Sequence, residues 1–281
     1  VGGGSQQGGG QFPINQRGQR SYTGTAVYGI DRWKLSQGTT ETVNIESNGI
    51  SISTLATFVQ AFENLGLQNG ETITLSAVID GVLISGSTTY NASSSYISVV
   101  EADGFRLAID PQIKYFQLFN SSGTSENLIQ AVKLEKGYLS TLARKDESGN
   151  WVLNDAPPSF QQELAKCQRY QVELVSTADP EFGPIGVCMG DSGAGASNFA
   201  IAMCPLPVPM RIKPTVITSG LFTLKKSPNV LNVSSIAVDR LSENAISLNV
   251  VVQGTVSIGE IYQLWHNPGS GNCSLLLDAN L

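Results

Sequence analysis

Residues 157–170 read PPSFQQELAKCQRY and carry the clearest helical pattern in the chain. Two prolines fix an extended approach, and Ser159 with Gln162 three positions later makes the capping-box arrangement that begins a helix. An apolar stripe follows at helical spacing, formed by Phe160, Leu164 and Cys167. The sequence therefore predicts a short connecting helix over 157–170.

The chain on either side of this helix has the period-two alternation and the turn residues of β structure. Before the helix, strands are expected at 71–80, 82–84, 96–100, 105–109, 115–119 and 128–135. After it they are expected at 199–203, 230–238, 245–252, 255–265 and 273–281. Many short strands at intervals of about ten residues are typical of a sandwich. We expect an all-β protein with an N-terminal jelly-roll sandwich over 12–156 and a C-terminal β-sandwich domain over 171–281.

Two stretches of the first domain are less regular. Asn48-Gly49 separates two short alternating runs and predicts a tight hairpin turn. Residues 54–67 fit a helical stripe as well as a strand, and periodicity alone does not choose between them. Residues 1–11 read VGGGSQQGGGQ, a flexible linker composition. We expect further chain upstream of it, unless it is partly an artificial addition.

The totals limit the classes of function. The 281 residues fit two domains or one large β domain, and 41% hydrophobic residues are enough for real cores. Formal net charge is −6, and no run of Lys or Arg is long, so nucleic acid and anionic membranes are poor partners. No stretch has the 18 or so consecutive apolar residues that span a bilayer. We expect a soluble chain without membrane insertion or cofactor.

The sequence offers no clear metal or redox centre. The cysteines lack the CxxC spacing of zinc sites, and His266 is the only histidine. Cys188 and Cys204 could pair across a loop, but buried free thiols are the simpler interpretation. Asp146, Ser148 and Asn150 resemble the start of a calcium loop, although the downstream Glu is missing and a hairpin turn explains them equally well.

One run resembles a catalytic motif. Gly190–Gly195 reads GDSGAG, similar to the nucleophile loop of chymotrypsin-like proteases. In those enzymes the histidine precedes the serine, whereas His266 follows Ser192, so a Gly/Ser loop is the preferred interpretation. Paired carboxylates for glycan hydrolysis stay possible, but nothing in the sequence selects a pair.

Aromatic residues flanked by amides and hydroxyls are the better functional signal, because a sugar stacks its apolar face on a ring and offers hydroxyls to polar groups. The candidates for ligand binding are Tyr90, Asn91, Tyr96, Trp151, Trp265, His266 and Asn267. For Trp151 and Trp265, partial burial in a sandwich is the competing explanation.

Other residues are predicted to have structural roles. Trp33 is expected in the core, with Asp31 and Arg32 holding the loop beside it as an ion pair. Leu164, Cys167 and Tyr170 are expected to pack at the helix, Cys167 as a small buried residue and not as a reactive thiol.

Five groups of residues, in this order, resemble a known family. They are INQRGQRSYTG and YGIDRW (14–33), TFVQAFENL and GETITLSAVIDG (57–81), IQAVKLEKG (129–137), FQQELAKCQRY (160–170), and VPMRIKPTV with LLLDANL (208–281). The chain after Phe12 is similar to phage and prophage tail-fibre or receptor-binding proteins with an E-L-x-x-C-Q-R-Y helix.

This resemblance implies a carbohydrate-binding-module-like jelly roll, a linking helix and a C-terminal β domain. It also implies a homotrimer in the virion tail, made in the bacterial cytoplasm, that contacts other phage tail proteins and binds a bacterial surface glycan without enzymatic activity. The alternatives are a purely structural tail adaptor and a surface glycan hydrolase or esterase.

Overall fold

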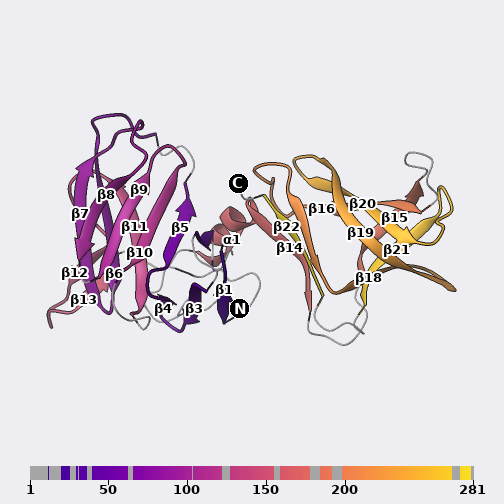
Figure 1. The fold of residues 1–281 in the computed structure, drawn as a ribbon, viewed down its shortest axis with the longest axis horizontal. Helices are drawn as coiled ribbons and strands as arrows, with labels where there is room; N and C mark the ends of the chain where they lie inside the picture. The colour runs from indigo at the N-terminus through magenta and orange to yellow at the C-terminus, as the bar shows by residue number, and fades with distance from the viewer. Residues whose placement is uncertain are drawn as a thin grey trace. The chain divides into compact units, whose positions relative to one another are not determined.

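The structure, a computed structural model, describes residues 12, 20–25, 30, 32–36, 40–62, 66–102, 104–121, 127–154, 159–177, 184–191, 198–267 and 273–279. It divides the chain into two compact units, residues 1–164 and 165–281. Strands dominate both units, and the predicted all-β class with packed antiparallel sheets is confirmed (Figure 1).

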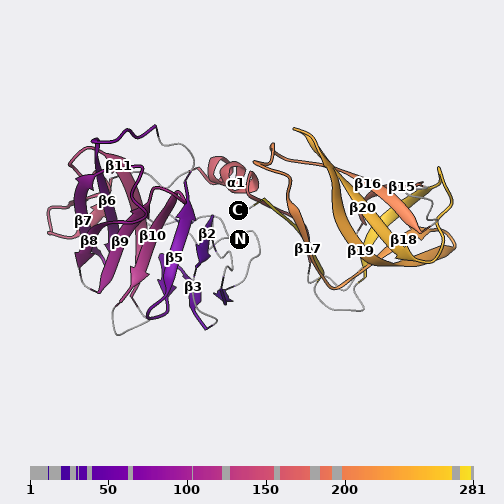
Figure 2. The same cartoon turned by 45° about the horizontal axis from the view of Figure 1, so that its top comes forward.

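Unit 1 contains two large antiparallel sheets and a two-stranded ribbon. Sheet A has the order β1-β3-β4-β11-β6-β7, with β1 Ser21–Thr23, β3 Thr42–Glu46, β4 Gly49–Ile52, β11 Ile129–Lys136, β6 Thr72–Ile79 and β7 Val82–Thr89. Sheet B has the order β2-β5-β10-β9-β8, with β2 Trp33–Leu35, β5 Thr57–Ala61, β10 Tyr115–Asn120, β9 Phe105–Asp110 and β8 Ile97–Ala102 (Figure 2). The ambiguous stretch 54–67 thus contains a strand, because β5 finds hydrogen-bonding partners in both β2 and β10.

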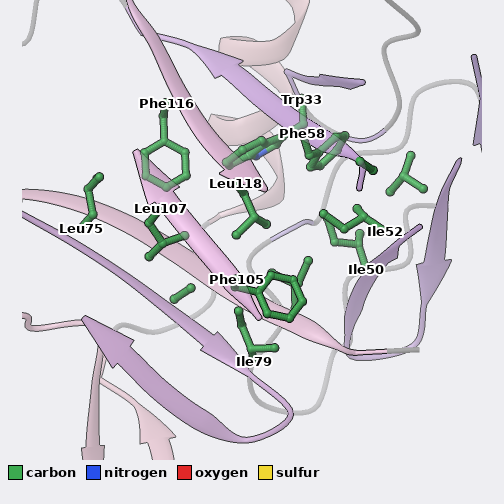
Figure 3. Close-up of a cluster of buried hydrophobic side chains, with 14 of the residues drawn as sticks. Trp33, Ile50, Ile52, Phe58, Leu75, Ile79, Phe105, Leu107, Phe116 and Leu118 are labelled. Atoms are coloured by element: carbon green, nitrogen blue, oxygen red, sulfur yellow. The ribbon is translucent and has the colours of Figure 1, made fainter. Parts of the chain in front are cut away.

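A large apolar core lies between sheets A and B. Trp33 is buried, as predicted, and its ring stacks on Phe58 at 5.1 Å between centroids and meets Phe116 edge-on at 5.4 Å. Sheet A supplies side chains such as Ile50 and Leu75 from the other side (Figure 3). Asp31 lies outside the described residues, so its predicted ion pair with Arg32 stays a prediction.

Short turns set the strand registers. Asp80 and Gly81 both have positive φ, 49° and 75°, and join Ile79 to Val82 in the two-residue turn that suits the twist of a hairpin. The hairpin expected at Asn48-Gly49 is present but shifted by one residue, because Gly49 already pairs with Glu46 at the start of β4.

The outer face of sheet A is covered by a short ribbon. Strands β12 (Ala143–Lys145) and β13 (Trp151–Leu153) pair with each other. Leu142 and Ala143 bury Val78 and Ala131 of the sheet. This cover explains why β6 is buried on both of its faces.

The single helix in the described part of the chain is α1, Phe160–Gln168. Its first turn starts as predicted, since the Glu163 N–H donates to the Ser159 carbonyl at 3.0 Å. The predicted stripe buries only Cys167 fully, while Leu164 is half-buried and Phe160 is half exposed. The helix is nine residues long and ends at Gln168. No described helix is long and apolar enough to cross a membrane.

The C-terminal end of the helix is tied to unit 2. The Arg211 N–H donates to the Arg169 carbonyl at 2.8 Å, and the Ala279 N–H donates to the Tyr170 carbonyl at 2.7 Å. The buried Tyr170 ring also lies under the Arg211 guanidinium at 5.6 Å. Tyr170 therefore has the structural role that the sequence predicted.

Unit 2 combines a closed barrel with a three-stranded sheet. The barrel order is β15-β16-β20-β19-β18-β21, with β15 Pro184–Asp191, β16 Phe199–Pro205, β20 Ala245–Gln253, β19 Asn229–Leu241, β18 Leu221–Lys226 and β21 Ile261–Asn267. The sheet order is β14-β22-β17, with β14 Gln171–Thr177, β22 Cys273–Asp278 and β17 Thr215–Ser219. The sequence predicted a sandwich here. Inward alternation is the same in a sandwich and a barrel, and only the pairing of β18 and β15 with β21 closes the ring.

The cysteines of the barrel are free and buried. Cys188 pairs in register with Ala202, two positions from Cys204 on the same strand. Burial, together with a smaller contribution from the neighbouring Cys204, raises the pKa of the Cys188 thiol to about 12. Burial also raises the pKa of the Cys204 thiol.

These thiols predict a loss of stability at alkaline pH. A raised pKa in the folded state favours folding below the ordinary pKa of 9.0, and this contribution disappears as the pH rises towards 12. Over that range the free energy of unfolding of the wild type should fall faster than that of Cys188→Ala, by up to about 1.4 kcal/mol per pH unit. Urea denaturation at several pH values measures the two slopes, and equal slopes would contradict the assignment.

Two glycines of β15 give a matched test of barrel packing. A Cβ on Gly190 would lie 2.1 Å from the Ser257 carbonyl oxygen, whereas a Cβ on Gly186 would lie 3.8 Å from the nearest atom, Cys204 Sγ. Gly190→Ala should therefore lower the free energy of unfolding by about 3 kcal/mol, as overpacking does. Gly186→Ala should change it by less than about 1 kcal/mol. Urea denaturation of both full-length variants measures the two free energies of unfolding. Similar values for the two variants would contradict the prediction and show that the 257–260 turn can shift at little cost.

Candidate functional site

The outer face of sheet B, called the sheet B face below, is the strongest candidate site. Along β10, Phe116 and Leu118 point into the core, so Tyr115, Gln117 and Phe119 point to the opposite face. All three are half-buried. They form a row of aromatic, amide and aromatic side chains on one strand.

The centre of the sheet B face is a polar group above small neighbours. Gln117 pairs with Val59 of β5 on one side and with Ala108 of β9 on the other. Val59 and Ala108 are each only 1% exposed, so larger side chains around them fill the surface. The Gln117 amide makes no hydrogen bond within the part of the chain that the structure describes, and it is available to a ligand.

A cation and two rings lie on one side of Gln117. Arg106 pairs in register with Phe119, and its guanidinium carbon lies 4.7 Å from the centroid of that ring. The same carbon lies 5.6 Å from the ring centroid of Tyr96, which is 42% exposed. The buried Nε of Arg106 has no hydrogen-bond partner among the described residues.

A second cation lies on the other side of Gln117. Lys34 Nζ donates to the Tyr115 hydroxyl at 2.8 Å and lies 4.8 Å from the centroid of its ring. Asp110 is opposite Tyr115, but its Oδ1 accepts the N–H groups of Gln112 and Ile113 at 3.0 and 3.1 Å. That carboxylate oxygen is therefore used within the turn that follows β9.

This arrangement suits an extended polar ligand. Aromatic rings flank an available amide, and the two cations are held by those rings in defined positions. Such a surface can stack the apolar face of a sugar and hydrogen-bond its hydroxyls.

The predicted binding loop contributes only one residue to the sheet B face. Tyr96 lies on it, whereas Tyr90 is 8% exposed and belongs to the apolar core. Asn91 stabilises its own turn, because its Oδ1 accepts the Ser93 N–H at 3.0 Å. Tyr90 is thus unavailable to a sugar ring, since its backbone pairs with Gly70 and Glu71 and turns the side chain inward.

Trp151 is not part of the sheet B face. It lies on β13, in the ribbon that packs on the outer face of sheet A. It is half-buried against the small cluster that covers Val78, and Lys145 Nζ lies 5.4 Å from its ring centroid. The candidate calcium residues form the turn of the same ribbon. Asp146 Oδ1 accepts the N–H groups of Ser148 and Asn150 at 2.9 Å each, which is the hairpin turn that the sequence allowed. The described residues contain no cluster of metal-ligating side chains.

Strand alternation separates the three C-terminal candidates. Trp265 lies on the outside of the barrel, where Lys225 Nζ is 4.4 Å from its ring centroid and its Nε1 donates to Gln263 Oε1 at 3.1 Å. His266 points into the barrel and is 3% exposed. The Asn267 side chain lies outside the described residues. These neighbours in sequence therefore do not form one site.

A groove of about 560 Å³ lies beside Gln263, between β21 and the β18–β19 hairpin. It is lined by Lys225, Lys226, Ser227, Pro228, Asn229, Val230, Ile261 and Gln263. Lys226 forms an ion pair with Glu260, so its charge is already compensated.

The protease-like run is only partly described. Gly190 and Asp191 end β15, and Ser192–Gly195 lie outside the described residues. His266 is enclosed in the barrel, where it pairs in register with Phe222. No described geometry places this imidazole at an accessible nucleophile.

Of the residues on the sheet B face, only Tyr96 is predicted from the sequence as a binding residue. Phe116 and Leu118 identify YFQLFN (115–120) as a strand, and the same alternation assigns Tyr115, Gln117 and Phe119 to its other face. These three residues could therefore have been predicted from the sequence. The positions of Arg106 and Lys34 beside them could not be predicted, because they depend on strand order across the sheet.

Comparisons of the chain with protein-family models, with characterised protein sequences and with solved structures gave no match.

Proposed function

We propose that this chain is a non-enzymatic phage or prophage tail-fibre or receptor-binding protein that recognises a bacterial surface glycan through the sheet B face. The observation that carries the proposal is the row Tyr115, Gln117 and Phe119, with an amide that no described residue engages. The sequence resemblance to tail-fibre proteins supports the biological setting, a virion tail acting at the host cell surface.

In this proposal, Gln117 hydrogen-bonds sugar hydroxyls at the centre of the face. Tyr115 and Tyr96 supply apolar contact on either side, and the rings keep Arg106 and Lys34 in place before the ligand arrives. Preorganised side chains lose little conformational entropy on binding. A shallow face of this kind binds each glycan weakly, so several copies acting together would raise the avidity.

We propose a homotrimer as the source of this avidity, with an apolar strip on the barrel as its contact. The apolar strip consists of Val187, Met189, Met203 and Ile261, which are 54–65% exposed. They are neighbours on β16, β15 and β21, because Val187 pairs with Met203 and Met189 pairs with Ile261.

The composition of the apolar strip favours a second copy of the chain as its occupant. Contiguous exposed apolar side chains mark interaction surfaces, and methionine adapts to the shape of a partner. The strip contains no charged residue, although the chain as a whole has a net charge of −6. Three copies can therefore bring this strip together around a three-fold axis without repulsion between like charges at the contact.

The apolar strip also favours the second candidate function, a structural tail adaptor that assembles with other phage tail proteins. The two functions differ in one observable property. An adaptor assembles without binding host cells, whereas a receptor-binding protein does both.

The glycan function predicts a loss of binding in Gln117→Ala. Removing one amide hydrogen bond costs about 1 to 1.5 kcal/mol, which is roughly a tenfold loss of affinity. The full chain, labelled with a fluorophore, is tested on an array of purified bacterial capsular polysaccharides and on whole cells. Gln253→Ala, an exposed position of the barrel, is the matched control and should bind as the wild type does. Equal affinity of the wild type and Gln117→Ala, or no binding by either, would contradict the proposal.

The oligomer predicts that charges in the apolar strip disrupt assembly. The double variant Val187→Glu, Met203→Glu should sediment as a monomer, because like charges would be buried at each contact. Leu139→Glu, at a residue 79% exposed in unit 1, should leave the wild-type trimer intact. Sedimentation velocity of the three proteins checks this. A monomeric wild type at tens of micromolar, or a trimeric double variant, would rule out this contact.

A further inference from the structure

We infer that the glycan bound at the sheet B face carries an oxyanion, a carboxylate or a phosphate, which the Arg106 guanidinium binds. This inference rests on the proposed glycan function and adds the chemical class of the ligand.

Arg106 is a cation without a compensating charge. It is half-buried in β9, and it makes no ion pair or hydrogen bond with any described residue. Burial of an unpaired charge is costly, and proteins normally pair such groups. The rings of Phe119 and Tyr96 offset part of that cost by cation–π attraction but use none of the guanidinium N–H donors.

The acidic side chain opposite Arg106 does not neutralise it. Glu101 is directly opposite on β8, a register position at which cross-strand ion pairs commonly form. Glu101 is exposed and forms no ion pair with Arg106. The guanidinium instead lies 4.7 Å from the centroid of the Phe119 ring on β10, next to the proposed position of the sugar.

A guanidinium held close to two rings is matched to an oxyanion. Its planar fork can donate two parallel hydrogen bonds to a carboxylate or phosphate, and each is stronger than a bond to a neutral hydroxyl. The two ring contacts restrict the side chain before binding, which reduces the entropy lost on complex formation.

Lys34 is a less suitable anchor. It lies on β2, separated from β9 by β5 and β10, so it is roughly 14 Å from Arg106 at the usual strand spacing. Its ammonium already donates to the Tyr115 hydroxyl. One oxyanion cannot reach both cations, and we assign the contact to Arg106.

The test compares acidic polysaccharides with their neutral counterparts. Uronate-containing capsular polysaccharides are paired with their carboxyl-reduced forms, and glycerol-phosphate teichoic acids form a separate arm. The full chain should bind at least one acidic arm about tenfold more tightly than the neutral forms, as charge-assisted hydrogen bonds predict. The arm that binds distinguishes a carboxylate from a phosphate ligand. Higher salt should weaken acidic binding and leave neutral binding unchanged.

Three variants locate the effect. Arg106→Gln should abolish the preference for acidic ligands, while Glu101→Gln should strengthen acidic binding because it removes a like charge beside the ligand. Arg240→Gln, whose side chain is 88% exposed on the barrel, should behave as the wild type does. Thermal unfolding verifies that each variant is folded, and the salt dependence of the wild type needs no variant.

Failure of the oxyanion contact and failure of the glycan function would give different results. Binding of neutral forms as tight as that of acidic forms, but still sensitive to Gln117→Ala, would leave the glycan function standing and overturn the oxyanion contact. Absence of binding to every polysaccharide and to cells would overturn both.

Discussion

The buried core between sheets A and B fixes everything that the surface of unit 1 can present. A strand has two faces, and once Phe116 and Leu118 are committed to the core, Tyr115, Gln117 and Phe119 must lie outside. A slip of one residue in the register would bury the amide and expose the apolar residues. The stacking of Trp33 on Phe58 and its edge contact with Phe116 bind β2, β5 and β10 into this arrangement.

The two sheets differ in what lies outside them. The ribbon of β12 and β13 lies over sheet A, where Leu142 and Ala143 bury Val78 on the outer face. No element within the described ranges covers sheet B in the same way, and its outer face retains half-buried aromatic and polar groups. We therefore place the proposed glycan site on sheet B, because a ligand needs polar groups that the fold has left unused.

Side chains also alternate between two faces along the strands of unit 2, where the faces are the inside and the outside of a barrel. Closure of the barrel buries Cys188, Cys204 and His266 inside and leaves Met189 and Met203 outside. An apolar outer strip on a rigid barrel is suited to association, while the sheet B face is suited to a polar ligand. The two units thus offer surfaces of different chemistry, and we propose that the apolar strip serves assembly and the sheet B face serves recognition.

Much of the secondary structure could be read from the sequence, because alternation, glycine turns and the Ser159 cap are local signals. The candidate site could be read only in part. Tyr96 was found because its loop is rich in amides and hydroxyls, whereas Tyr90 shares that loop and is buried by its pairing with Glu71. Trp265 and His266 are adjacent in sequence and lie on opposite sides of the barrel wall.

The all-β class, the helix that begins after Ser159, and the face on which each strand residue lies follow from the amino-acid sequence. These properties depend on contacts between residues close in the chain. The order of the strands depends on the tertiary fold, and so do the contacts of Arg106 with Phe119 and of Lys34 with Tyr115, and the closure of the barrel in unit 2. Strand order is set by hydrogen bonds between segments that are distant in the chain. The alternation of residues along one strand does not identify the strand with which it pairs.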